Sequence, residues 1–280
     1  MRILKTIAET RKELAQFRNK SIGLVPTMGF FHEGHLSLME QARQECDIVV
    51  VSLFVNPTQF GQGEDFEQYP RDEIRDAELA QSTGIDYIFQ PSVKEMYPES
   101  FNTTVVLGST LTEKMCGSSR PGHFEGVATV VTKLFNIIQP ERAYFGQKDA
   151  QQLVVIKSFV RDLNLPIEII GMPIIREEDG LAKSSRNIYL SHKEREQALG
   201  LYRALCLGEG LVKGGLLKRS DLIRKVKEYL LSQPGLEVDY FEAVQAEDLS
   251  APNILKGKII LAGAVKVGST RLIDNKLLEV

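Results

Sequence analysis

The chain has 280 residues, of which 43% are hydrophobic and 25% are charged, and 34 basic and 37 acidic residues give it a net charge of −3. This composition is that of an ordinary globular protein with one or two domains, and it excludes disordered, collagen-like and disulfide-scaffold chains. Because no basic face or polybasic run stands out, we expect no nucleic acid and no membrane as partners. Charges interrupt every short apolar run at the N-terminus, so we expect neither a signal peptide nor a membrane anchor there.

The cysteines indicate a reducing compartment. Cys46, Cys116 and Cys206 are isolated, odd in number and outside any CxxC pair. That pattern argues against a disulfide framework and against a structural zinc site. We therefore expect a cytoplasmic protein.

The predicted elements begin with an amphipathic helix over residues 6–19, where Thr6 and Glu9 have the spacing of a capping box. An apolar strand follows over 22–25, and a glycine-containing turn leads into a helix over 35–46. Residues 47–55 form a nearly continuous apolar run, which is typical of a strand buried on both faces of a parallel sheet. The alternation continues with helices over 72–83, 126–138 and 149–163 and strands over 85–89, 143–146 and 167–175.

Strands that alternate with helices predict an α/β fold, a Rossmann-like doubly wound parallel sheet, over residues 1–175. The pattern changes from about Arg176 onward. There we predict a long helix capped by Ser191, a helix after Ser220, and strands over 236–244 and 258–267. Residues 176–280 are thus expected to form a smaller α+β domain.

The segment PTMGFFHEGH, residues 26–35, stands where the first of these strands turns into its helix. Such a turn offers backbone N–H groups and a positive helix end to phosphate. His32 and His35 are three residues apart and share a helix face, and Gly34 lets a nucleotide approach the backbone. Two imidazoles at this place indicate hydrogen bonding to the triphosphate of ATP. The alternative is that they cap the helix or satisfy core groups; a metal site is disfavoured because no third ligand stands nearby.

A second loop, GLAKSSRN, covers residues 180–187. Lys183, Ser184, Ser185 and Arg186 offer two fixed charges and two hydroxyls, which suit a pentavalent α-phosphate and a departing pyrophosphate. The alternative is a solvated surface run.

Further polar residues follow other predicted strands. Asn56 and Gln59 lie just beyond the strand over 47–55, and Lys148 and Asp149 lie at the strand-to-helix turn after 143–146. Gln59 and Gln152 are candidates to read the hydroxyls and carboxylate of a small polar acid, and Lys148 to neutralise β- or γ-phosphate charge. The alternative for Lys148 is an ordinary surface lysine.

The HEGH motif resembles the HxGH signature of the nucleotidyltransferase superfamily, which includes class I aminoacyl-tRNA synthetases. Read in order, PTMGxxHxGH, FVNPxQF, YPR, RPGHFxGV, FGxKDxQQ and GLAxSSRN resemble the pantothenate synthetase family, the pantoate–β-alanine ligases, over roughly residues 22–190. The resemblance implies that ATP and pantoate give pantoyl adenylate and pyrophosphate, and that β-alanine then yields pantothenate and AMP. It also implies Mg²⁺, a homodimer, and a C-terminal domain that acts as a lid over ATP.

The same resemblance assigns roles to individual residues. His35 is the expected proton donor, Gln59 the contact for pantoate and β-alanine, Gln152 a contact for pantoate, and Asp76 the carboxylate associated with Mg²⁺. Together with Lys148, the residues His32, Ser184, Ser185 and Arg186 complete the expected catalytic set. The expected ATP site comprises Met28, Gly29, Phe30, Phe31, His32, Glu33, Gly34, His35, Gly146, Gln147, Lys148, Asp149, Ile175, Lys183, Ser184, Ser185 and Arg186.

Three positions and two rival functions stay open. Lys183 stands where the family often has Leu or Met and either assists phosphate binding or points to solvent; Gln147 stands where Glu is common. His123 either lines the phosphate side of the site or is a structural residue at a helix start. The rivals are a nucleotidyltransferase that leaves AMP on a phosphorylated acceptor, and an ATP-binding regulatory module without turnover.

Overall fold

A computed structural model describes all 280 residues, and they divide into two compact units. The parallel-sheet unit comprises residues 1–108, 120–146 and 155–172, and the antiparallel-sheet unit comprises 109–119, 147–154 and 173–280. The units therefore interleave along the chain. The domain limits expected from the sequence, 1–175 and 176–280, remain a prediction.

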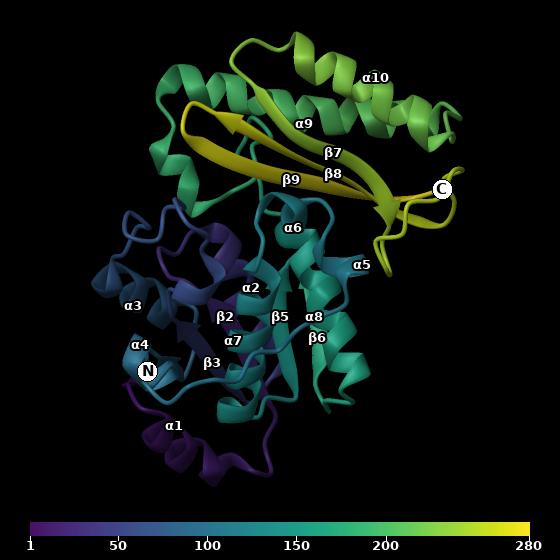
Figure 1. Cartoon of the computed structure of the whole chain (residues 1–280). Coiled ribbons are helices and arrows are strands. Elements are labelled where there is room, and N and C mark those ends of the chain that lie inside the picture. The colour runs from purple at the N-terminus through teal and green to yellow at the C-terminus, as the bar shows by residue number, and fades with distance from the viewer. The chain divides into compact units, whose positions relative to one another are not determined.

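Six parallel strands form the first unit's sheet (Figure 1). Their order is β1-β4-β3-β2-β5-β6, so the direction of strand addition reverses between β2 and β5. The predicted doubly wound fold is confirmed, and the reversal is the kind of switch point at which such sheets bind ligands. The strands are β1 (Arg2–Leu4), β2 (Ile22–Thr27), β3 (Ile48–Leu53), β4 (Tyr87–Phe89), β5 (Arg142–Gly146) and β6 (Glu168–Met172).

Helices flank this sheet because alternate strand residues need apolar cover on both faces. Val25, Val49 and Val51 of β2 and β3 pack with Met39 and Ala42 of α2 in one buried cluster. On α1, the Thr6 side chain accepts from the Glu9 N–H, which is one half of the predicted capping box, whereas the Glu9 carboxylate accepts from the Lys5 N–H. The helices are α1 (Ile7–Leu14), α2 (Glu33–Glu45), α3 (Glu73–Ser82), α4 (Val93–Met96) and α7 (His123–Ile138), with 3₁₀ turns η1 (Ala15–Phe17) and η2 (Pro57–Gln59); α8 (Ala150–Asp162) runs through residues of both units.

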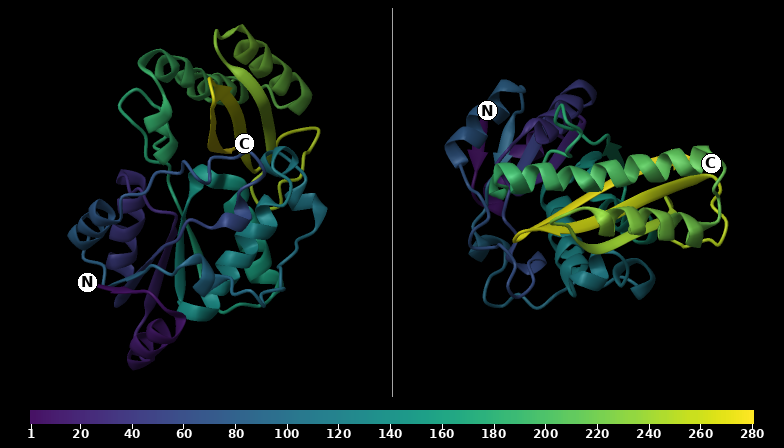
Figure 2. Two further views of the ribbon diagram at one scale, coloured as in Figure 1. Left: turned by 60° about the vertical axis from the view of Figure 1, so that its left-hand side comes forward. Right: turned by 90° about the horizontal axis from the view of Figure 1, so that it is seen from above.

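The second unit is built on the antiparallel strands β7 (Glu237–Gln245), β8 (Lys258–Val267) and β9 (Thr270–Glu279). Two long helices, α9 (His192–Lys213) and α10 (Arg219–Ser232), pack on one face of these strands through an apolar cluster (Figure 2). The other face packs against Met115, Ala150 and Val154. The unit also holds α5 (Ser109–Thr112), α6 (Cys116–Ser119), η3 (Gln147–Asp149) and η4 (Ser185–Tyr189). This is the smaller α+β part that the sequence predicts.

The structure adds two strands that the sequence does not predict, β1 and β9. It shortens the helix predicted over 6–19 to α1 and the turn η1, and it moves two helix starts. Helix α2 begins at Glu33 rather than His35, and α7 begins at His123 rather than Gly126. Both helices start inside segments rich in glycine, where apolar periodicity is absent. None of the helices combines the length and the apolar character that crossing a membrane requires.

Candidate active site

The HEGH segment forms the N-terminus of α2, directly after the carboxyl end of β2. His32 is the N-cap residue, and its Nδ1 accepts a hydrogen bond from the Gly34 N–H at 3.1 Å. The His32 N–H in turn donates to Nδ1 of His35 at 3.3 Å. The two rings lie 4.1 Å apart between centroids. The histidines therefore share one helix face, and both also cap the helix.

These two hydrogen bonds fix the tautomer of each neutral ring. Because Nδ1 of His32 and Nδ1 of His35 both accept from backbone N–H groups, neither atom carries the proton. The proton of each neutral imidazole is then on Nε2, which leaves each ring as an N–H donor on the side away from the helix backbone. Gly34 lies close beneath, since a Cβ at this position would stand 2.9 Å from the His32 ring.

Asp76 of α3 holds the loop that leads into these histidines. Its two carboxylate oxygens accept from the backbone N–H groups of Phe30 and Phe31, each at 2.6 Å. Gly29 and Phe30 both have positive φ, 88° and 52°, a conformation that costs energy for a residue with a side chain. Burial raises the pKa of Asp76 above its ordinary value, against the two N–H groups, which lower it. Asp76 thus stabilises a strained turn in the predicted nucleotide loop.

Gln59 lies at the end of η2, just beyond β3, and its amide is held from two sides. Its Oε1 accepts from Nδ2 of Asn56 at 3.2 Å, and its Nε2 lies 3.1 Å from the sulfur of Met28. Asn56 is buried and also donates to the carbonyl of Gly126 on α7. A Cβ on Gly126 would lie 2.3 Å from the carbonyl oxygen of Thr58, so only glycine lets α7 approach η2 this closely.

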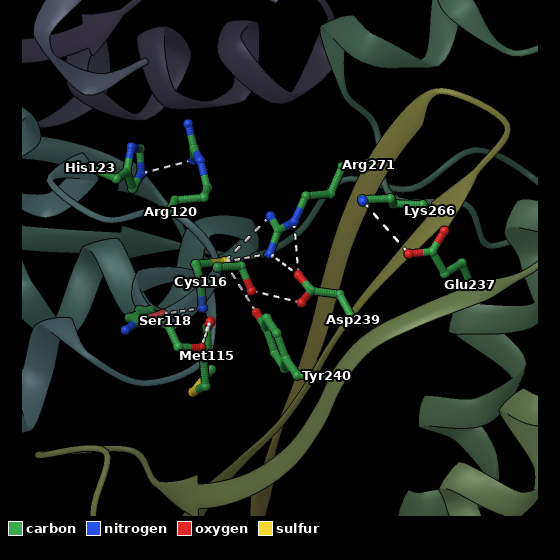
Figure 3. Close-up of polar contacts among 12 residues, drawn as sticks. Met115, Cys116, Ser118, Arg120, His123, Glu237, Asp239, Tyr240, Lys266 and Arg271 are labelled. Carbon is green, nitrogen blue, oxygen red and sulfur yellow. Dashed lines mark hydrogen bonds and ion pairs between the residues drawn. The ribbon is translucent and has the colours of Figure 1, made fainter. Parts of the chain in front are cut away.

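The motif RPGHFEGV supports the backbone at Gln59. Nδ1 of His123 donates to the Gln59 carbonyl at 2.8 Å, and Nη1 of Arg120 donates to Nε2 of His123 at 3.0 Å (Figure 3). Arg120 also donates through Nε and Nη2 to Glu64, at 2.7 and 2.6 Å. Burial acts to raise the pKa of Glu64, but the Arg120 ion pair outweighs it and holds that pKa below its ordinary value. His123 is therefore a support of the loop after β3.

Lys148 lies in η3, a part of the antiparallel-sheet unit. The carbonyls of Gln147 and Lys148 both accept from the side-chain amide of Asn275 on β9. The Lys148 side chain is half-buried. Gln152, further on in α8, is half-buried. Its neighbour Gln151 is buried, and the side-chain oxygen of Gln151 accepts a hydrogen bond from the Cys116 N–H.

The second predicted phosphate loop, residues 180–187, follows a tight hairpin in which Arg176 pairs with Ala182 in the same unit. The Lys183 N–H donates to the carbonyl of Ile175 at 3.0 Å, which joins two residues of the predicted ATP set. The Lys183 ammonium lies 3.6 Å from a carboxylate oxygen of Glu177. Lys183 is therefore held in an ion pair and does not simply point to solvent. Ser184 then caps η4 by accepting from the Arg186 N–H, and Ser185 is buried.

A buried polar cluster anchors residues 109–119 in this unit. The Arg271 guanidinium donates to Asp239 at 2.7 Å and contacts the sulfur of Cys116, which also lies 3.2 Å from the Tyr240 hydroxyl (Figure 3). Ser119 donates to the same Asp239. These contacts hold α6 against β7 and β9, and we assign them a structural role.

Several supports of the site leave no signal in the sequence. Asn275, Glu64 and Asp274 are distant in sequence from the residues they hold, so no local motif marks them. The described residues contain no group of three or more His, Cys, Asp or Glu side chains that could hold a metal ion. Each carboxylate oxygen of Asp76 accepts one backbone N–H of the loop.

A doubly wound parallel sheet, with two imidazole N–H donors at the helix that follows a central strand, defines a nucleotide-binding α/β protein. The sequence also matches the pantoate-beta-alanine ligase family over residues 2–277. The chain belongs to this family.

Individual relatives agree along nearly the whole chain. The pantothenate synthetase of Syntrophomonas wolfei is 56% identical over 263 residues, which are 94% of this chain and 93% of the relative. The crystal structure of pantothenate synthetase from Thermus thermophilus has a TM-score of 0.94 and 47% identity, and covers 99% of both chains. A structure of the Francisella tularensis ligase, described as complexed with beta-gamma ATP and beta-alanine, has a TM-score of 0.81 and 34% identity, and covers 99% of this chain and 97% of its own.

Proposed function

We propose that this chain condenses pantoate with β-alanine at the expense of ATP and gives pantothenate, AMP and pyrophosphate through a pantoyl adenylate. The observation that carries the proposal is membership of the pantoate–β-alanine ligase family over residues 2–277. The HEGH geometry supports it, because two neutral rings with Nε2–H donors at a helix N-terminus suit a polyphosphate. The Francisella relative with ATP and β-alanine supports the same pair of substrates.

In the first half reaction the pantoate carboxylate attacks the α-phosphorus and pyrophosphate leaves. The obstacle is repulsion between two anions, so the protein must neutralise charge and position the reactants. We assign His32 and His35 to phosphate oxygens through Nε2–H, and the neutral His35 ring donates its hydrogen bond to the departing pyrophosphate and keeps its proton. Lys148 and Arg186 supply fixed positive charge, and the hydroxyls of the Ser184–Ser185 pair are donors to the same polyphosphate.

In the second half reaction the amine of β-alanine attacks the acyl carbon and AMP leaves. We assign Gln59 to pantoate and β-alanine and Gln152 to pantoate, because amides can read both hydroxyl and carboxylate groups. The support of Gln59 from Asn56 and His123 fits a group that must hold a small substrate in register. A neutral amine close to the acyl carbon needs no strong dedicated base.

Mg²⁺ is proposed to reach the protein on the ATP phosphates. This metal keeps most of its waters and is usually held by substrate phosphates with one or two carboxylates, so a protein cage is not required. When bound, it would add to charge neutralisation. Asp76 acts as the support of the Phe30–Phe31 backbone in this proposal, and its role at the metal, expected from resemblance, is not used in any step.

The direct test is incubation with ATP, Mg²⁺, pantoate and β-alanine, followed by mass spectrometry of the products. We expect AMP, pyrophosphate and pantothenate in equal amounts. Without β-alanine, pyrophosphate should stop at about one equivalent per site, because the adenylate stays bound. A final product that keeps AMP on a phosphorylated acceptor would favour a plain nucleotidyltransferase, and ATP binding without any pyrophosphate would favour a regulatory module.

We further propose a cytoplasmic location and a homodimer. The location is supported by three free cysteines, which suit a reducing compartment. The dimer rests on family resemblance alone, and light scattering of the purified protein tests it.

A further inference from the structure

Asn275 on β9 makes a complete set of hydrogen bonds to the loop that carries Lys148. Its Nδ2 donates to the carbonyls of Gln147 and Lys148, both at 2.9 Å, and its Oδ1 accepts from Nε2 of Gln147 at 3.3 Å. The residue is only 2% exposed. Both amide protons and the amide oxygen are therefore used on one loop, and two successive carbonyls of that loop are fixed at once.

The neighbouring residue, Asp274, does the same for the other predicted phosphate loop. Its carboxylate accepts from both terminal nitrogens of Arg176, at 2.7 and 3.0 Å, and Arg176 also donates to the carbonyl of Gly180 at 3.0 Å. The guanidinium lies over the Tyr202 ring, 4.5 Å from its centroid. Gly180 has a φ of +95°, and a Cβ there would lie 2.1 Å from the same ring. Arg176 thus fixes the turn from which Lys183–Arg186 emerges.

Strand geometry explains how adjacent residues can serve two loops. Successive side chains of a strand point to opposite faces of the sheet. Asn275 pairs with Ala262, which belongs to the cluster with Ala150 and Val154 at the start of α8. Asp274 pairs with Gly263, where a Cβ would meet Leu201 of α9. One residue therefore faces η3 and α8, and the next faces the helix layer and the 176–183 hairpin (β9 is labelled in Figure 1).

We propose that Asp274 and Asn275 are positioning residues for adenylate formation: Asn275 sets the place of Lys148, and Asp274 acts through Arg176 on the loop of Lys183–Arg186. The inference rests on the proposed function, which gives both loops their role at the polyphosphate. Neither residue needs to touch substrate. The β8–β9 ladder holds both, so the two loops share one rigid reference.

The test is a double-mutant cycle on pyrophosphate release from ATP and pantoate. Asn275→Asp keeps the shape of the side chain but turns a carboxylate toward two carbonyl oxygens. We expect the rate to fall on the order of 10- to 100-fold, as a misplacement of about 1 Å can cost. The KM for pantoate should stay within about twofold, since pantoate is assigned to other residues. In the Lys148→Ala background, the same substitution should change the rate by less than about threefold, because its effect passes through Lys148.

Leu272→Ala is the matched control on the same strand. It removes a buried apolar side chain from the cluster under α9 and α10 without touching the Lys148 loop. It should lower the melting temperature, while its effect on rate should be the same in wild-type and Lys148→Ala backgrounds. If Asn275→Asp behaves in this additive way, or has the wild-type rate, the inference is overturned.

A second variant keeps the inference testable if Asn275→Asp does not fold. Arg176→Lys retains the charge beside Asp274 but loses the two-pronged contact, and its cycle against Arg186→Ala should show the same non-additivity. Additive effects there would overturn the inference. The proposed function fails in a different way: wild-type protein would release no pyrophosphate, or Lys148→Ala would be as fast as wild type, and either result overturns both proposals.

Discussion

The Nδ1 atom of His123 lies 2.8 Å from the backbone carbonyl oxygen of Gln59. The contact joins the start of α7 to the end of η2, two elements that are 64 residues apart in the chain. It settles the tautomer of His123, because Nδ1 donates to a carbonyl while Nε2 accepts from Arg120. The loop proposed to hold pantoate and β-alanine is thereby tied to a helix of the core.

His123→Ala should therefore raise the KM for pantoate on the order of tenfold, the cost of about one lost hydrogen bond. The KM for ATP should change by less than about twofold, because the nucleotide is assigned to other residues. His123→Asn returns an N–H donor near the Gln59 carbonyl and should recover most of the loss. Steady-state kinetics with each substrate varied in turn measures this; equal changes in both KM values would show a general structural effect instead.

His32→Asn separates capping from phosphate binding at α2. Asparagine is among the best N-cap residues, so the variant should keep the helix end and melt close to the wild-type temperature. It lacks the Nε2–H donor, and we expect pyrophosphate release to fall by about 10²- to 10³-fold, as for the loss of one preorganised donor. A folded variant with wild-type turnover would reduce His32 to a helix cap.

Asp76→Asn tests the support of the Phe30–Phe31 backbone. The amide can accept from only one of the two N–H groups and faces the other with a donor, so we expect about 1–3 kcal/mol of destabilisation and a higher KM for ATP. Asp72→Asn is the matched control on the same helix, since asparagine can still cap α3 at the Arg75 N–H. The Mg²⁺ concentration for half-maximal activity should be unchanged in both variants; a selective shift in Asp76→Asn would make Asp76 a metal ligand.

Two glycine substitutions on helices should have opposite effects on stability. Gly126→Ala places a methyl group 2.3 Å from the Thr58 carbonyl oxygen and should cost about 1–3 kcal/mol or more through overpacking. Gly210→Ala lies in α9 with open space around the new Cβ and should be neutral or stabilising by up to about 1 kcal/mol. Urea unfolding gives both values. Equal effects would mean that α7 and η2 are not in such close contact.

The Glu64–Arg120 ion pair predicts a dependence of stability on pH. The pKa of Glu64 is lower in the folded chain than its ordinary value, so the pair stabilises fully above the unfolded pKa of about 4.3 and loses its effect as pH falls through the folded pKa. At about pH 7, Glu64→Gln should lower the free energy of unfolding by about 1.5–3 kcal/mol. This difference from wild type should shrink below about pH 4. Urea unfolding over a pH series measures it, and a difference that grows toward acid would have the wrong sign.

The sequence predicts the sheet and the main motifs because those signals are local. Ile48–Leu53 is apolar almost without interruption, and the HEGH and KSSR segments are contiguous. The sequence does not predict β9, because Asp274, Asn275 and Lys276 interrupt its apolar alternation. It does not predict β1, because that strand has only three residues. One of these polar residues, Asn275, holds the Lys148 loop. Strand prediction from apolar alternation therefore fails at a position for which we propose a functional role.

The remaining supports depend on contacts between distant segments. Nothing near His123 in the sequence points to Gln59, and nothing near Asp76 points to Phe30 and Phe31. The reason that position 126 must be glycine is likewise visible only when α7 lies against η2. These contacts form only through tertiary packing, and the periodicity of the sequence gives no information about them.

The bond between Asn275 and the Lys148 carbonyl spans 127 residues, and this has a consequence during synthesis. At translation rates of about 5–20 residues per second, roughly 6–25 s pass between the appearance of Lys148 and that of its partner. For that time the nascent chain can already pair β3 with β2 and β4. Its lysine loop, however, lacks the donor that fixes it, so a growing chain on the ribosome acquires a nucleotide loop well before it can activate an acid.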